Sequence, residues 1–149
     1  MKAGELAPDF ELPDETGTPR KLVELLADGP VVLFFYPAAM TKGCTVESCH
    51  FRDLAAEFAA VGASRIGISP DEVAKQAAFS EKHSFDFPLL SDPDGAVATQ
   101  FGVRRGFGPL ATKRQTFVID TDRSVIEVIK SEFRMAVHAD RALEVLRAR

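Results

Sequence analysis

The hydrophobic positions along the chain follow two spacings, one typical of buried strands and one typical of helices. Residues 31–36 are continuously apolar and end at Pro37, as expected of a strand that is covered on both faces. From residue 44 to residue 61, apolar side chains recur every three or four positions, which predicts a helix. Similar patterns predict further strands at 65–69, 87–90, 116–119 and 125–129, and helices at about 70–83, 96–101 and 137–147.

The order of these elements predicts the fold class. Strands that alternate with helices and then end in a hairpin indicate an α/β fold with a mixed central β-sheet flanked by helices. Residues 9–12, followed by the turn residues 13–17, predict a short N-terminal β-hairpin. The thioredoxin-like arrangement fits this order best. Because the chain has no internal repeat, low-complexity tract or linker, residues 1–149 are predicted to form a single domain.

Composition and charge narrow the classes of function. A chain of 149 residues can bury a sizeable core, so it needs no disulfide or metal to stay folded. Its net charge of −4 gives no electrostatic reason to expect nucleic acid or an anionic membrane as a partner. The longest apolar run is too short to cross a bilayer, and the first residues do not resemble a secretory signal. We therefore expect a cytoplasmic protein whose 2 cysteines are free, catalytic or redox-sensing.

Residues 37–49 carry the candidate chemistry, because they lead from the end of a buried strand into a helix. In open α/β sheets, ligands and reactive groups gather at such junctions. If Thr41 lies near the helix N-cap, Cys44 falls in the first turn, among backbone N–H groups that have no partner within the helix. These donors and the helix dipole favour a thiolate over a thiol at Cys44.

A helix end alone is a weak source of reactivity. It typically contributes ~0.3–1 kcal/mol to an adjacent negative charge, and nucleophilicity falls as a thiol becomes more acidic. We therefore expect a cation near Cys44, and fixed donors that stabilise the leaving oxygen of the substrate. Arg114 is the candidate cation, because it opens an apolar strand and could project inward at the end of the sheet. The hydroxyl of Thr41 is a candidate donor.

The second cysteine, Cys49, lies five residues after the first. On a continuous helix, residues at this spacing are separated by about 7.5 Å of rise and point about 140° apart. Their Cα atoms would then lie beyond the ~7 Å limit for a disulfide. If Cys44 and Cys49 form a disulfide, the first turns of the helix must unwind, so we predict an ordered reduced helix and a locally unfolded oxidised one. The alternative is that Cys49 is a buried small hydrophobic residue, as free cysteines often are.

A wider set of residues around Cys44 matches a known signature. The set comprises Pro37, Thr41, Cys44, Thr45, Glu47, Cys49 and the run Phe51-Arg52-Asp53. It resembles the active-site signature of the peroxiredoxins and, more narrowly, that of the Q-type subgroup, also called bacterioferritin comigratory proteins. The resemblance spans nearly the whole chain, with further matches at 8–12, 31–37, 87–92 and 114–120.

The resemblance implies a role for each site residue. Cys44 would be the peroxidatic cysteine, and Cys49 would be its resolving cysteine in an intramolecular disulfide. Thr41 would orient the peroxide, and Pro37 would shield and shape the pocket. Arg114 would be the active-site arginine.

The implied activity is the reduction of hydrogen peroxide and organic hydroperoxides. The thiolate would become a sulfenic acid and then a disulfide, which thioredoxin or a similar dithiol protein would reduce. No metal or organic cofactor takes part in such a cycle. The subgroup resemblance also implies a monomer or a weak homodimer.

Two other classes of function stay open. A dithiol–disulfide oxidoreductase acting on proteins would normally carry Cys-x-x-Cys, which this chain lacks. A redox sensor or metal-binding module on the same fold is a further alternative, with Cys44, Cys49 and His50 as candidate ligands. For His50, His83 and His138, a surface or hydrogen-bonded position is the simpler expectation.

Two neighbouring features bear on the site. Glu47 lies three residues after Cys44, on roughly the same helix face. A carboxylate beside a thiolate would disfavour the ionised sulfur, so we expect Glu47 to bond to backbone or arginine groups instead. The alternative is an acidic residue that complements the helix N-terminus. The Gly-rich segment Gly106–Thr112 is hypothesised to be a mobile flap near the site.

Overall fold

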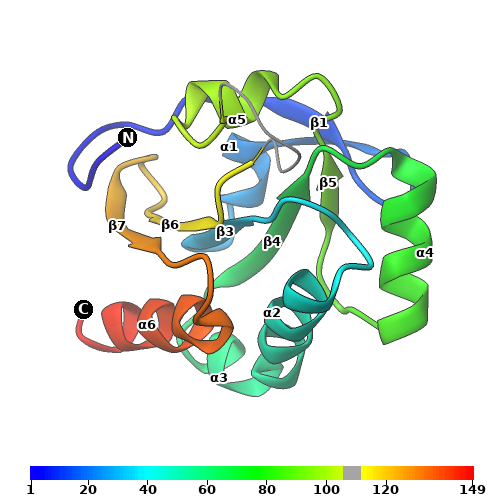
Figure 1. Ribbon diagram of the computed structural model, residues 1–149. Helices are drawn as coiled ribbons and strands as arrows, with labels where there is room; N and C mark the ends of the chain where they lie inside the picture. The colour runs from blue at the N-terminus through cyan, green and yellow to red at the C-terminus, as the bar shows by residue number, and fades with distance from the viewer. Residues whose placement is uncertain (106–111) are drawn as a thin grey trace.

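The computed structural model describes residues 1–105 and 112–149, and these residues form a five-stranded sheet with helices on both faces (Figure 1). The strand order is β5-β4-β3-β6-β7. Neighbours β5, β4 and β3 run parallel, whereas β6 and β7 are antiparallel to the strands beside them, so the sheet is mixed as predicted. The strands of this sheet are β3 (Val31–Phe35), β4 (Ser64–Ser69), β5 (Leu89–Ser91), β6 (Gln115–Ile119) and β7 (Val125–Lys130).

The N-terminal hairpin predicted from the sequence is also present. Strand β1 (Glu11–Pro13) pairs with β2 (Pro19–Lys21) in a separate antiparallel sheet. Its turn is organised by Asp14, whose carboxylate accepts bonds from the backbone N–H groups of Thr16 and Thr18. The short helix α1 (Leu22–Leu25) follows directly and was not predicted, because four residues are too few to show a helical period.

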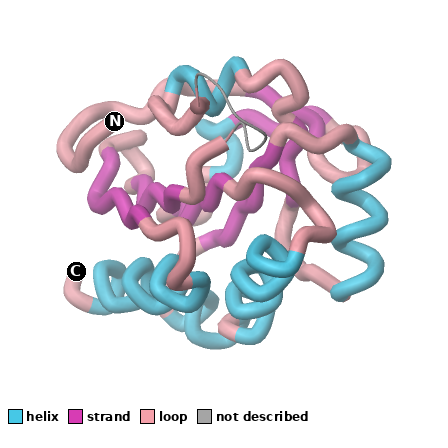
Figure 2. Tube along the Cα trace, in the orientation of Figure 1, coloured by secondary structure: helices cyan, strands magenta, loops and turns pink. Residues whose placement is uncertain are grey.

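The helices cover the two faces of the sheet unequally (Figures 1 and 2). Helices α2 (Lys42–Asp53), α3 (Ala55–Ala60), α4 (Val73–His83) and α6 (Met135–Arg147) pack on one face. The other face is covered by α1 and by α5 (Ala96–Gln100), together with Phe10 from the N-terminal segment. No helix in the described part of the chain is both long enough and apolar enough to cross a membrane.

Strand β3 explains why residues 31–36 are apolar without interruption. Val32 and Phe34 point into the core beneath the larger group of helices, whereas Leu33 and Phe35 point into the core on the α1 and α5 side. Both faces of the strand are therefore buried, as the sequence pattern indicated.

The helix predicted over 44–61 is wrong in its extent, because the structure contains two helices there. Helix α2 begins two residues earlier, and the chain leaves helical geometry at Leu54, where φ is −98° and ψ is 21°. The Leu54 amide bonds to the Phe51 carbonyl, three residues back, which is a tighter turn than the α-helical one. The break leaves Phe51 and Phe58 in the same core, with ring centroids 5.8 Å apart, so the apolar period does not reveal it.

The register of the sheet determines where the chemistry can gather. Phe35, the last residue of β3, pairs with Gln115, the first residue of antiparallel β6. Arg114 therefore arrives at the end of β3, just where the chain turns toward α2. The carboxyl end of parallel β4, at Ser69, lies beside the carboxyl end of β3, so both strands end on the same side of the sheet.

Candidate active site

The loop between β3 and α2 is fixed by a proline and by one tether to the segment that follows β4. Pro37 is buried directly after Tyr36. The backbone N–H of Ala39 donates to Oδ2 of Asp71 at 2.6 Å, and the Ser69 hydroxyl donates to the same oxygen at 2.7 Å. Met40 then takes a left-handed conformation with φ of 69°, which non-glycine residues rarely adopt. The loop is thus held in one conformation at some local strain.

Cys44 lies in the first turn of α2, as the sequence predicted. Thr41 is the N-cap residue, with extended backbone, and its carbonyl accepts the first bond of the helix from the Thr45 N–H at 2.9 Å. The Cys44 side chain is fully buried and its thiol is free. The sulfur therefore lies close to the unpaired N–H groups of a helix N-terminus, away from water.

Arg114 reaches the sulfur directly. Its Nη2 donates to Cys44 Sγ at 3.3 Å, and its Nη1 donates to Glu47 Oε1 at 2.7 Å. The side chain is almost completely buried, and its backbone N–H donates to Glu132 Oε2 at 3.0 Å. Burial alone would lower the pKa of Arg114, but the charges of Glu47 and Cys44 raise it, so the guanidinium stays charged. The predicted meeting of Arg114 with Cys44 is present in the structure.

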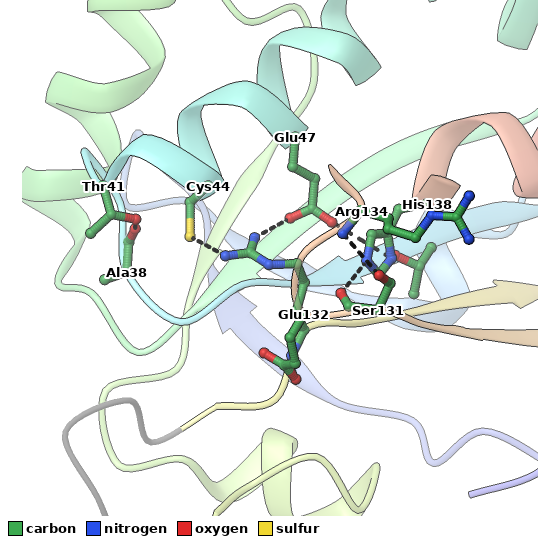
Figure 3. A network of polar contacts seen from close by, with 10 residues as sticks. Ala38, Thr41, Cys44, Glu47, Ser131, Glu132, Arg134 and His138 are labelled. Atoms are coloured by element: carbon green, nitrogen blue, oxygen red, sulfur yellow. Dashed lines mark hydrogen bonds and ion pairs between the residues drawn. The ribbon is translucent and has the colours of Figure 1, made fainter. Parts of the chain in front are cut away.

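Glu47 bonds to an arginine, as expected, and is not in the first turn of the helix. It is fully buried, and burial raises its pKa to about 8 against the opposing charge of Arg114. Its second oxygen, Oε2, faces Nδ1 of buried His138 at 3.6 Å (Figure 3). Burial lowers the pKa of His138. A chain of polar groups therefore runs from the sulfur through Arg114 and Glu47 to α6.

Gly43 allows two side chains to approach the helix closely. A Cβ atom on this residue would lie 3.0 Å from Cε of Met135 and 3.3 Å from Nη2 of Arg114. The absence of a side chain lets both groups pack against the residue that precedes Cys44.

Thr41 and Cys49 lie near Cys44 along the chain but do not bond to it. The Thr41 hydroxyl donates to the Ala38 carbonyl at 2.7 Å, and its side chain is exposed beside the site (Figure 3). Cys49 is a free, half-buried thiol further along the same unbroken helix, and burial raises its pKa. Two cysteines five residues apart on one helix match the ordered reduced state that the sequence predicted.

The three histidines lie at the surface or in hydrogen-bonded positions, as the simpler expectation predicted. His50 bonds to Asp140 at 2.7 Å, His83 stacks against Phe85, and His138 is hydrogen-bonded in the core. Among the residues that the structure describes, no group of three His, Cys, Asp or Glu side chains could hold a metal ion. The proposed flap at Gly106–Thr112 lies outside the described residues, except for buried Thr112.

Sequence reasoning missed several residues that shape the site. Asp71 acts from the segment that follows β4, and His138 and Met135 act from α6, so their relation to Cys44 depends on the tertiary fold. Gly43 could have been noticed in the sequence, because glycine destabilises a helix and its presence in the first turn indicates that another group approaches closely there.

Comparison with known proteins agrees with this geometry. The AhpC/TSA family model matches residues 3–128. Peroxiredoxin Bcp of Escherichia coli strain K12 is 39% identical over 152 residues, covering 99% of this chain and 96% of that protein.

Two solved structures give the same result. The crystal structure of peroxidoxin BcpB from Mycobacterium tuberculosis superposes with a TM-score of 0.96 and 67% identity, covering 99% of this chain and 97% of that one. The bacterioferritin comigratory protein of Xanthomonas campestris, studied for alkyl peroxide reduction, gives a TM-score of 0.88 with 33% identity, covering 99% and 98% of the two chains. With its thioredoxin-like fold, the chain belongs to the AhpC/TSA family and is a peroxiredoxin of the Q-type, bacterioferritin comigratory group, a thiol-dependent peroxidase.

Proposed function

We propose that Cys44 is the peroxidatic cysteine and that Arg114 is the cation that activates it. The observation that carries this proposal is the 3.3 Å bond from Arg114 Nη2 to Cys44 Sγ, at the N-terminus of a helix. A buried positive charge and the helix end both favour the thiolate. Cys49 has neither: burial raises the pKa of its thiol, and Asp53 adds to this effect while Arg52 opposes it.

The first chemical step follows from this assignment. The Cys44 thiolate attacks one oxygen of the peroxide, the O–O bond breaks, and the departing oxygen takes up a proton to leave as water or an alcohol. Arg114 stabilises the negative charge that develops on the departing oxygen. Thr41 orients the peroxide through its exposed hydroxyl, and buried Pro37 shields the pocket and sets its shape.

We further propose that Cys49 resolves the Cys44 sulfenic acid. The Cys49 thiol displaces water from the sulfenic acid and forms an intramolecular disulfide. On the continuous helix, ideal geometry puts the two Cα atoms roughly 8.7 Å apart, too far for a disulfide. The turns of α2 from Lys42 to Cys49 must therefore unwind before the bond can form.

The remaining steps of the cycle complete the proposal. Hydrogen peroxide and organic hydroperoxides are the substrates, and thioredoxin or a similar dithiol protein is the reductant. The chain forms one domain and acts as a monomer or a weak homodimer. It works in the cytoplasm, where a dithiol reductant returns the disulfide to two thiols. The chemistry resides in the sulfur atoms and uses no metal or organic cofactor.

A single-turnover experiment tests these roles. The reduced protein is mixed with one equivalent of hydrogen peroxide, and free thiols and intact mass are followed for wild type, Cys44→Ser and Cys49→Ser. Wild type should lose both thiols, and Cys44→Ser should show almost no rapid reaction. Cys49→Ser should accumulate the sulfenic acid or its over-oxidised products.

Two outcomes would overturn parts of the assignment. Rapid peroxide consumption by Cys44→Ser would remove Cys44 from its role. Unchanged steady-state turnover of Cys49→Ser with thioredoxin as reductant would show that Cys49 is not the resolving cysteine.

A conservative Arg114→Lys variant should react about 10²–10³-fold more slowly with peroxide, since lysine lacks the forked donors that reach Cys44 and Glu47 together.

A further inference from the structure

The carboxyl group of Glu47 has an oxygen without a donor. Oε1 accepts from Arg114, but Oε2 is buried and has no hydrogen-bond partner among the described residues. An ionised carboxylate with one bare oxygen in the core is unfavourable, since a buried unsatisfied polar atom typically costs about 1–3 kcal/mol, and more when charged. A proton on Oε2 removes the charge from the carboxyl group, which is the most costly part of this burial, and leaves Oε1 free to accept from Arg114.

The nearest group that can exchange this proton is His138. Its Nε2 lies 2.8 Å from the Ser131 carbonyl oxygen, which can only accept, so Nε2 carries a hydrogen. In the neutral ring, Nδ1 is then the bare nitrogen, and it accepts from the Thr116 hydroxyl at 2.8 Å. The same Nδ1 lies 3.6 Å from Glu47 Oε2. One proton can therefore reside on either partner, with the Thr116 hydroxyl reversing its direction to suit.

The charges around the pair favour one proton. Three charged or titratable groups surround the Glu47–His138 pair: Cys44 on α2, Arg114 just before β6, and Glu132 in the segment after β7. The charge of Glu132 is balanced by Arg105, whose guanidinium lies 3.1 Å from it. In the proposed reactive state, in which Cys44 is a thiolate, Arg114 balances the charge of the sulfur. The buried cluster is then neutral only if Glu47 and His138 together carry a single proton.

We propose that Glu47 and His138 hold one proton between them, and that this shared proton keeps the Arg114 guanidinium available to the sulfur of Cys44. The inference rests on the proposed roles of Cys44 and Arg114. When the pair loses its proton, Glu47 becomes a full carboxylate and the cluster gains a negative charge. The guanidinium is then drawn toward Glu47 and stabilises the reacting sulfur and the departing oxygen less. Glu47 and His138 are thus positioning residues that act through Arg114.

A pH profile of the reaction with peroxide tests the proposal. The single-turnover rate is measured between about pH 5 and about pH 10 in a Cys49→Ser background, where Cys44 is the only thiol. The rate should fall roughly fivefold or more on the alkaline side of the profile, as the shared proton is lost. Glu47→Gln should abolish the alkaline fall, because glutamine does not titrate. His138→Gln should move the fall to lower pH, because the proton has lost one of its two sites.

Matched control variants distinguish an effect of the shared proton from a general effect of replacing a glutamate or a histidine. Glu81→Gln and His83→Gln make the same chemical changes on α4, away from the cluster, and both should keep the profile of the background protein. Circular dichroism across the pH range excludes unfolding as the source of the fall. If His138→Gln does not fold, Glu47→Gln alone still decides the question.

A second measurement does not depend on peroxide chemistry. Imidazole nitrogen signals of the ¹⁵N-labelled protein report the proton on Nδ1 of His138. They should show a step at alkaline pH in wild type, when the shared proton is lost and a full negative charge forms on Glu47 beside Nδ1, and this step should be absent in Glu47→Gln. This step would persist even if Cys44 proved not to be the peroxidatic residue, so failure of the proposed function and failure of proton sharing are distinguishable.

Two results would overturn the proposal. The first is an equal loss of rate at every pH in Glu47→Gln and His138→Gln, with a profile of unchanged shape, which would show that the two residues only support the structure. The second is a His138 titration that is the same in wild type and in Glu47→Gln.

Discussion

The N-terminal half of α2 (Lys42–Cys49) and its shorter C-terminal half (His50–Asp53) are attached to the rest of the protein in different ways. The C-terminal half is held by apolar packing: Phe51 is fully buried and stacks on Phe34, with ring centroids 4.2 Å apart and planes 9° from parallel. Its last carbonyls also receive support, since Arg65 Nη1 donates to the Phe51 carbonyl at 2.8 Å. The N-terminal half places Cys44 in the core but has no buried aromatic ring, and Arg114 bonds to its Cys44 and Glu47 side chains.

The sequence of the N-terminal half adds to this contrast. Its residues include Gly43, Thr45, Val46, Ser48 and Cys49, none of which is a good helix former. The Thr41 side chain does not cap the helix, because its hydroxyl bonds to Ala38 instead. One helix therefore combines an apolar anchor with a segment of weak helix formers, and this segment is the one that we propose unwinds. A disulfide between Cys44 and Cys49 needs that combination.

Removing the apolar anchor should have the largest effect. Phe51→Ala deletes a buried ring, and such substitutions typically lower the free energy of unfolding by about 3–5 kcal/mol. Val46→Ala, in the N-terminal half, should change it by less than about 0.5 kcal/mol, because Val46 is 51% exposed. Urea denaturation of the two reduced variants measures the difference. Similar losses in both would show that the two halves are not anchored differently.

The halves should also respond oppositely to pH. The pKa of buried Glu47 is raised from the ordinary 4.5 to about 8, so the folded state holds a proton that the unfolded state loses. The contribution of Glu47 to stability is therefore full below about pH 4.5 and is lost as pH rises through about 8. Near the other half, the hydrogen bond from Arg65 lowers the pKa of Asp86, so its contribution is present at neutral pH and is lost as acid protonates it.

Denaturation at several pH values checks this contrast. The free energy of unfolding of Glu47→Gln, taken relative to wild type, should rise on the order of 3 kcal/mol between about pH 5 and about pH 9. Asp86→Asn should lose stability relative to wild type at neutral pH, and this loss should shrink in acid. A flat difference for Glu47→Gln across the range would contradict the assignment of a proton to the N-terminal half.

A smaller effect should come from the tether of the loop that precedes α2. Asp71→Ala leaves the Ala39 N–H and the Ser69 hydroxyl without their acceptor, which should lower the free energy of unfolding by about 1–2 kcal/mol. Peroxide reactivity should fall as well, because the loop carries Thr41. The control is Glu72→Ala, since Glu72 is exposed and its side chain does not cap α4. Equal behaviour of the two variants would show that the tether does not support the site.

Much of this arrangement could be predicted from the sequence, because the signals are local. The apolar run at 31–36 and the helical spacing around Phe51 predict the strand, the helix and the junction where Cys44 lies. The pairing of Arg114 with Cys44 could be predicted too, from the need for a cation and from a charged residue that opens an apolar strand.

The remaining features depend on tertiary structure. The break at Leu54 is hidden because Phe51 and Phe58 stay in one core on either side of it. Nothing in the sequence around His138 indicates a role at the site, because its Nδ1 comes close to Glu47 only when α6 packs against α2. Asp71 reaches the loop only because parallel β3 and β4 end at the same edge of the sheet.

Amide hydrogen exchange along α2, in the reduced protein and after one equivalent of hydrogen peroxide, shows directly whether the N-terminal half of the helix unwinds while the C-terminal half stays in place. In the reduced protein, the amides of residues 46–53 should be protected as one helix. After oxidation to the Cys44–Cys49 disulfide, residues 46–49 should exchange rapidly, whereas Phe51 to Asp53 should keep their protection because the apolar anchor stays in place. A disulfide that forms while residues 46–49 remain protected, or that releases Phe51 as well, would show that the N-terminal half does not unwind on its own.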